Sequence, residues 1–187
     1  MRKIIAALQT SVDCFIEGPN GEMDWATAED EKTWKVLNET LNSVDTLILG
    51  GRMYPEYEQY WLSLLANSSI GTENEKAYAR RADKIHHIVL SKTLDKVKWK
   101  TTRVVRDVEE IRKMKQQPGK DMLTFGGATM ISTLMNQRLI DEVHLIVNPL
   151  ILGEGKALFK DVKERRNLKL IEAKPLKSGK VSLMYNT

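Results

Sequence analysis

The chain has 187 residues, of which 42% are hydrophobic and 29% are charged, and it carries a formal net charge of +4. This length suits one domain over residues 1–187 with a sizeable core, and the mild positive charge suits anionic small molecules as ligands. Lysines and arginines are scattered, with no basic tract interleaved with aromatic residues, which argues against nucleic-acid binding.

Cys14 is the only cysteine of the sequence, which rules out an internal disulfide and a cysteine-based metal site. The first apolar stretch is short and soon meets Thr10, Ser11 and Asp13, so it predicts a strand rather than a signal peptide or a membrane span. We therefore expect a cytoplasmic protein without membrane contacts.

Short apolar runs rich in β-branched residues predict buried strands, and stretches with helical spacing or capping boxes predict helices between them. In chain order we expect a strand at Lys3–Leu8, a helix at Ala28–Leu41, a strand at Thr46–Gly50, a helix from Thr72 through Arg81, a strand at His87–Ser91, a helix that starts at Asp107, a strand at Met122–Gly126, a helix at Ala128–Met135 and a strand at Glu142–Pro149.

The end of the chain differs from this alternation. Two strands are expected around Ser178–Gly179, a hairpin signal, because Val181, Leu183 and Tyr185 alternate with Ser182 and Met184. Alternating strands and helices closed by a hairpin predict an α/β fold. Its sheet is mostly parallel, with helices on both faces and an antiparallel edge.

Two predicted strands end in glycine pairs and lead into a following segment. One junction is Gly50-Gly51-Arg52-Met53, and the other is Gly126-Gly127 before the helix at Ala128. Bare N–H groups at such junctions hold phosphates well, although each pair alone is more typical of a plain turn. Neither matches the Rossmann or P-loop pattern. A third strand ends in Ser91-Lys92, which adds a hydroxyl and a cation.

Several stretches in this order carry a wider resemblance, namely "ALQTSVDCFI", "DTLILGGRMYPEY", "IVLSKT" and "TFGGATMISTLMNQRLIDEVHLIVNPLILGEGKALF". With them the chain resembles the dihydrofolate reductase-like superfamily over nearly its whole length. Within that superfamily it resembles the RibD C-terminal domain family, the riboflavin biosynthesis reductases. The resemblance implies the dihydrofolate reductase-like three-layer sandwich and NADPH as the cofactor. Because no deaminase domain precedes it, a stand-alone member is expected.

The resemblance also implies a cofactor site. Arg52 is expected at the ribose 2′-phosphate or the pyrophosphate, and the alternative is a surface arginine paired with Glu56 or Glu58. The Gly126–Gly127 peptide is expected to be cis and to present its N–H groups to the pyrophosphate and nicotinamide side. The expected cofactor-binding residues are Gly51, Arg52, Met53, Ser91, Lys92, Gly126, Gly127, Ala128 and Thr129.

Fewer residues of the sequence indicate a substrate-binding site than indicate the cofactor site. Folate reductases carry an acidic residue five positions after a tryptophan, and counting from Trp25 gives Asp30 as the catalytic candidate. The alternative is that Asp30 only favours a helix N-terminus. Ile85 stands where folate reductases place an arginine for the glutamate tail. His86 and His87 point to opposite faces of a strand, so no metal site is expected.

We therefore expect an NADPH-dependent oxidoreductase that passes a hydride to a small nitrogen-containing substrate. The template that the resemblance supplies is 5-amino-6-(5-phosphoribosylamino)uracil, a substrate of riboflavin biosynthesis. The alternatives are a dihydrofolate reductase proper, disfavoured by Ile85, and a non-catalytic NADP-binding module. Relatives in this branch are commonly dimers, and we expect a homodimer with residues Pro149–Phe159 at or near the contact.

Overall fold

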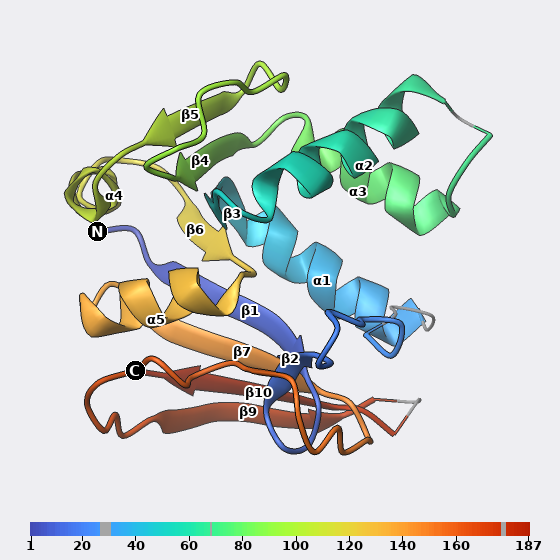
Figure 1. Ribbon diagram of the computed structural model, residues 1–187, viewed down its shortest axis with the longest axis vertical. Helices are drawn as coiled ribbons and strands as arrows, with labels where there is room; N and C mark the ends of the chain where they lie inside the picture. Colours follow the sequence, from blue (N-terminus) through green and yellow to red (C-terminus); the bar gives the residue numbers. More distant parts are fainter. Residues whose placement is uncertain (27–30, 68, 177–178) are drawn as a thin grey trace.

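A mostly parallel sheet forms the middle layer of this computed structural model, which describes residues 1–26, 31–67, 69–176 and 179–187 (Figure 1). Neighbouring strands run parallel from β5 to β7, and the last two strands are antiparallel. In spatial order the strands are β5 (Thr102–Val105), β4 (His86–Leu90), β3 (Val44–Gly50), β6 (Asp121–Thr124), β1 (Ile4–Thr10), β7 (Glu142–Val147), β10 (Val181–Asn186) and β9 (Lys169–Pro175).

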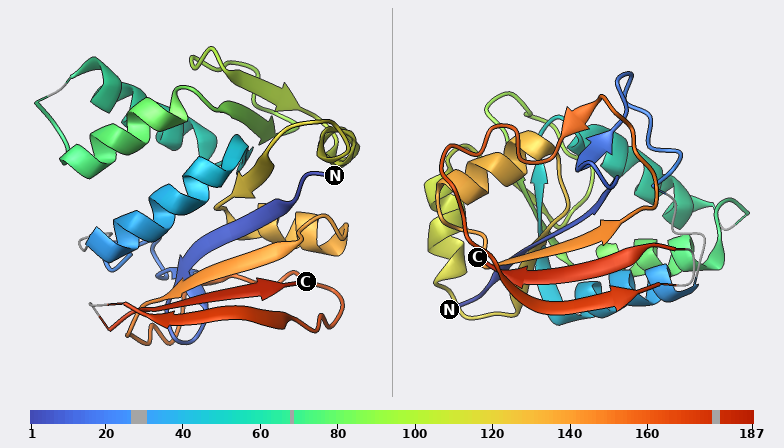
Figure 2. Two further views of the ribbon diagram at one scale, coloured as in Figure 1. Left: turned by 180° about the vertical axis from the view of Figure 1, so that it is seen from behind. Right: turned by 90° about the horizontal axis from the view of Figure 1, so that it is seen from below.

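Helices cover both faces of this sheet, as Figure 2 shows from behind and from below. On one face lie α1 (Glu31–Ser43), α2 (Tyr54–Ala66) and α3 (Glu73–Ala82), and on the other lie α4 (Val108–Lys115) and α5 (Ala128–Asn136). The three-layer α/β architecture expected from the sequence is therefore confirmed. A separate ribbon of β2 (Phe15–Glu17) and β8 (Lys156–Ala157) pairs antiparallel beside the main sheet.

The alternation of β1 divides its side chains between two cores. Ile4 and Ala6 pack with the α4 and α5 side, whereas Ile5 packs with the α1, α2 and α3 side. Strands buried on both faces are expected to be mostly apolar, and the central strands β1 and β3 contain the apolar runs Ile4–Leu8 and Leu47–Leu49. No helix in the described ranges is long and apolar enough to cross a membrane.

The predicted strands, helices and hairpin are all present, with shifts of a few residues at their ends. Helix α1 begins at Glu31 within the described residues, and residues 28–30 of the predicted helix lie outside them. The two strands of the hairpin approach its turn where the Leu176 N–H donates to the Lys180 carbonyl at 2.8 Å, and Ser178 of the predicted turn lies outside the described residues. Helix α2 and the short strands β2, β5 and β8 were not predicted.

Candidate functional site

Three strand ends meet at one edge of the sheet and form the core of the candidate site. Strand β3 pairs in parallel with β4 on one side and β6 on the other, so their carboxyl ends lie together. The Gly51 N–H donates to the Leu90 carbonyl at 3.1 Å, which ties the first glycine junction to the end of β4. In open α/β sheets this edge is where ligands bind.

The glycines at this edge lie close to the neighbouring strand ends, and Gly51 has no room for a side chain. A Cβ added to Gly51 would lie 2.4 Å from both Cβ and Oγ of Ser91. A Cβ added to Gly50 would lie 3.7 Å from the Gly126 carbonyl oxygen and the Gly127 nitrogen. The Ser91 hydroxyl oxygen accepts hydrogen bonds from the backbone N–H groups of Thr93 (3.3 Å) and Leu94 (3.0 Å). The predicted residues Gly51, Ser91 and Gly126 are thus brought together in a surface of bare backbone.

The second glycine junction opens helix α5. The Gly126–Gly127 peptide is cis, as expected from the resemblance, and Gly126 has φ +138°. The N–H groups of Met130 and Ile131 donate to the Gly127 carbonyl at 2.9 and 3.2 Å. Those of Ala128 and Thr129 have no acceptor among the described residues, and such groups are the donors that bind anions at helix N-termini.

Two of the predicted cofactor-binding residues are cations at this same edge of the sheet. Arg52 and Lys92 are both exposed and form no ion pair with any residue in the described part of the chain. In particular, Arg52 does not pair with Glu56 or Glu58. Glu58 is buried instead, where its carboxylate accepts from the Tyr54 hydroxyl (2.9 Å) and from two backbone N–H groups.

Sequence reasoning missed a third cation at this edge. Arg106 follows β5, and its guanidinium donates to the Ser91 carbonyl and to Asp95 Oδ1, both at 2.8 Å. It therefore lies beside the Ser91 loop together with Lys92. The only available signal was the run "TRVVR", which is too short and too charged to indicate a buried strand.

The remaining predicted site residues are Met53, Ala128, Thr129 and Asp30. Met53 is half-buried, and its sulfur lies 3.6 Å from where a Cβ on Gly126 would be. Ala128 is buried and Thr129 is exposed on the first turn of α5. Asp30, the catalytic candidate, lies outside the described residues.

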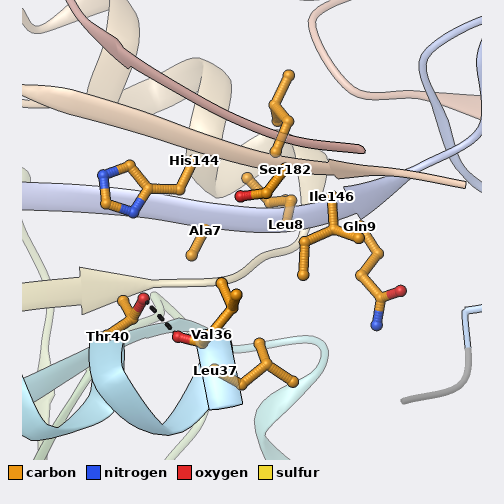
Figure 3. A pocket seen from close by; sticks show the side chains of 10 residues that line it. Ala7, Leu8, Gln9, Val36, Leu37, Thr40, His144, Ile146 and Ser182 are labelled. Carbon is orange, nitrogen blue, oxygen red and sulfur yellow. Dashed lines mark hydrogen bonds between the residues drawn. The ribbon is translucent and has the colours of Figure 1, made fainter. Parts of the chain in front are cut away.

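A small cavity lies between α1 and the strands β1, β7 and β10 (Figure 3). It encloses about 80 Å³, and its walls are mostly apolar. Of its polar side chains, Gln9 donates to the Ala26 carbonyl at 2.9 Å and Thr40 donates to the Val36 carbonyl at 3.0 Å. The lining residues are Ala7, Leu8, Gln9, Val36, Leu37, Thr40, His144, Leu145, Ile146 and Ser182.

A charged network ends at the wall of this cavity. Lys3 Nζ donates to Glu142 Oε1 at 2.6 Å, and Glu142 Oε2 lies 2.9 Å from His144 Nε2. Burial raises the pKa of Glu142, but the hydrogen bonds from Lys3 and His144 outweigh it and keep that pKa below its ordinary value. Because a carboxylate only accepts, His144 Nε2 carries a proton, and the buried Nδ1 on the other side of the ring has no hydrogen-bond partner among the described residues.

Comparisons with known proteins agree with this architecture. The sequence profile of a family described as "RibD C-terminal domain" matches residues 2–182. The uncharacterized protein YyaP of Bacillus subtilis (strain 168) is 36% identical over 186 residues, 99% of this chain and 95% of that protein.

Solved structures share the fold at low sequence identity. A putative riboflavin biosynthesis protein from Shewanella sp. PV-4 has a TM-score of 0.71 at 20% identity, over 100% of this chain and 98% of that one. A diaminohydroxyphosphoribosylaminopyrimidine deaminase/5-amino-6-(5-phosphoribosylamino)uracil reductase from Thermotoga maritima has a TM-score of 0.65 at 14% identity. This match covers 99% of this chain and 56% of that longer one.

Proposed function

We propose that this chain, which belongs to the RibD C-terminal domain family, is an NADPH-dependent reductase of a small nitrogen-containing substrate. Family membership and the fold shared with riboflavin-biosynthesis reductases support a reductase-like role. The substrate template is 5-amino-6-(5-phosphoribosylamino)uracil, the compound after which the Thermotoga maritima reductase is named.

The observation that carries this proposal is the junction of the three strand ends. Its bare glycine backbone, two open N–H groups and exposed cations form a donor set that fits the phosphates of a dinucleotide. Arg52, Lys92 and Arg106 would hold the 2′-phosphate side, and the Gly126–Gly127 turn with Ala128 and Thr129 would hold the pyrophosphate. When bound, NADPH supplies the hydride, and the protein supplies binding and orientation.

We assign the substrate to the cavity between α1 and the sheet, because β1, which contributes to its lining, pairs with β6, the strand that leads to the glycine turn. Its apolar walls suit the faces of a heterocycle, and the Gln9, His144 and Ser182 side chains suit its polar edge. Ile85 is buried in the apolar core, so no cation stands at that position for a folate glutamate tail. This supports the riboflavin-type template over folate.

Cofactor choice gives the first test. Replacing Arg52 with alanine should weaken NADPH binding by about 1–3 kcal/mol, the range for a charge-assisted hydrogen bond, and NADH binding by much less. Titration calorimetry with both cofactors measures this difference. Arg165→Ala is the control, because Arg165 is another exposed arginine without a partner among the described residues. Equal losses for the two cofactors would exclude Arg52 from the 2′-phosphate site.

Turnover gives the second test. The wild-type protein should oxidise NADPH steadily with 5-amino-6-(5-phosphoribosylamino)uracil or a close aminopyrimidine and not with dihydrofolate. The decrease in NADPH absorbance measures the rate. Tight NADPH binding without turnover on any member of such a panel would identify a binding module instead of an enzyme.

A further inference from the structure

Lys156 reaches the glycine turn from a part of the fold that no prediction connected with the cofactor. It lies in β8, which pairs with β2 through Phe15 and Ala157 and through Glu17 and Lys156. The Leu158 N–H also donates to the Cys14 carbonyl at 3.0 Å. This ribbon fixes the backbone from which the lysine side chain extends.

The ribbon is closely packed just before Lys156. A Cβ on Gly155 would lie 2.2 Å from the Glu17 carbonyl oxygen, and Gly155 has φ +138°, a conformation that other residues rarely adopt. The two backbones therefore touch at this point. Lys156 thus has a well-defined starting position on β8.

The Lys156 ammonium group is held over the turn by a carboxylate. Its Nζ donates to both oxygens of Glu17, at 3.0 and 2.9 Å. The same Nζ lies 4.0 Å from where a Cβ on Gly127 would be, and 42% of the lysine side chain is exposed. An ammonium group has three N–H donors, and the two carboxylate oxygens of Glu17 accept from two of them. One donor is left for a ligand at the turn.

We propose that Lys156 binds the phosphate oxygens that NADPH and NADH have in common, at the Gly126–Gly127 turn. Glu17 holds the ammonium group in place for this contact. The inference rests on the proposed cofactor site and adds a residue to it. It divides the cations by role: Arg52, Lys92 and Arg106 recognise the 2′-phosphate, and Lys156 recognises the dinucleotide irrespective of that phosphate.

The test compares Lys156→Gln with wild type for both cofactors, by titration calorimetry at fixed ionic strength. Loss of one charge-assisted hydrogen bond should weaken the binding of NADPH and of NADH by a similar factor, about tenfold. Lys156→Arg should restore most of the affinity because it keeps the charge. Lys160→Gln, which removes the same charge from an exposed position of the same segment, is the control and should change neither affinity. Circular dichroism verifies that each variant is folded.

Each outcome separates this inference from the cofactor proposal. Unchanged cofactor affinity in Lys156→Gln, or a loss confined to NADPH or to the substrate KM, overturns the role of Lys156 while the proposed function stands. If wild type binds neither cofactor, the proposed function fails, and inorganic pyrophosphate becomes the probe. Binding of pyrophosphate to wild type and its loss in Lys156→Gln would then support Lys156 as the phosphate contact. No binding at all would overturn both.

Discussion

At the scale of single residues, the two adjacent histidines of β4 have opposite environments. His86 is exposed and His87 is fully buried, as the alternation of a strand predicts. The His87 ring lies in an aromatic cluster, 4.4 Å from Trp99 and 5.8 Å from Tyr57 between ring centroids. Burial lowers the pKa of His87 to about 4, although Asp83 and Glu58 oppose this effect. The ring is therefore neutral in the folded protein at neutral pH.

This burial predicts a pH dependence of stability. The unfolded chain binds a proton at His87 below about pH 6.5, whereas the folded chain does so only near pH 4. Stability should therefore fall as the pH drops from 6.5 to 4, by about 2–3 kcal/mol from this group. In a plot of unfolding free energy against pH, His87→Phe should remove most of the fall between pH 6.5 and 4, whereas His86→Gln should leave it unchanged. Urea unfolding at a series of pH values measures it, and parallel curves for wild type and His87→Phe would contradict the buried neutral histidine.

At the scale of elements, the sequence pattern predicts long apolar strands well and short polar ones poorly. Strands β1, β3 and β7 carry continuous apolar runs, and their positions were predicted within a few residues. Strands β2, β5 and β8 have only two to four residues, so no period can be read from them. Helix α2 buries Tyr54, Tyr57 and Leu64 at helical spacing, but Glu58 is buried among them and Pro55 lies in the first turn, so its apolar stripe is hard to recognise in the sequence.

The same limit decided which site residues could be predicted. Gly51, Ser91 and Gly127 end strands or open helices that the pattern shows, so their convergence followed from a parallel sheet. Arg106 and Lys156 follow or occupy the short strands β5 and β8, and their place depends on tertiary packing alone. A lysine that approaches the site from another part of the chain leaves no local pattern in the sequence.

The β2–β8 ribbon gives a prediction at this scale. Gly155→Ala should destabilise the protein by about 3 kcal/mol or more, because its Cβ would meet the Glu17 backbone and its φ is positive. Gly153→Ala is the matched control: φ is +78° there, but nothing lies within 4 Å of the added Cβ. It should cost only about 1 kcal/mol. Thermal and urea unfolding of both variants measure the difference, and equal costs would mean that the close approach to Glu17 does not constrain the ribbon.

At the scale of the whole molecule, the sheet is covered unevenly. Both faces of β7 are covered by this chain's own elements, since Val143 and Leu145 pack toward α5 and Ile146 is buried as well. This apolar strand therefore needs no second copy of the chain to cover it. Exposed apolar groups remain elsewhere. Within the described residues they include Ile151, which is 75% exposed, and Leu170 and Ile171 on the edge strand β9.

The expected homodimer can be tested with a substitution at Ile151. It lies in the Pro149–Phe159 region expected at the contact of a homodimer. A two-fold interface there should bury about 1,000 Å² or more in total and remove this side chain from water. Light scattering should then give twice the chain mass of 21.4 kDa at micromolar concentration. Ile151→Lys should shift the mass toward one chain, because it places a charge in an apolar contact.

Ile70→Lys supplies the comparison, since Ile70 is also exposed but lies far along the chain, in the segment between α2 and α3. It should leave the dimer intact. A mass of one chain for wild type would contradict the homodimer. A dimer that survives Ile151→Lys and dissociates with Ile171→Lys would move the interface to the open edge of β9. In that arrangement the unpaired backbone groups of the edge strand would bind the second copy.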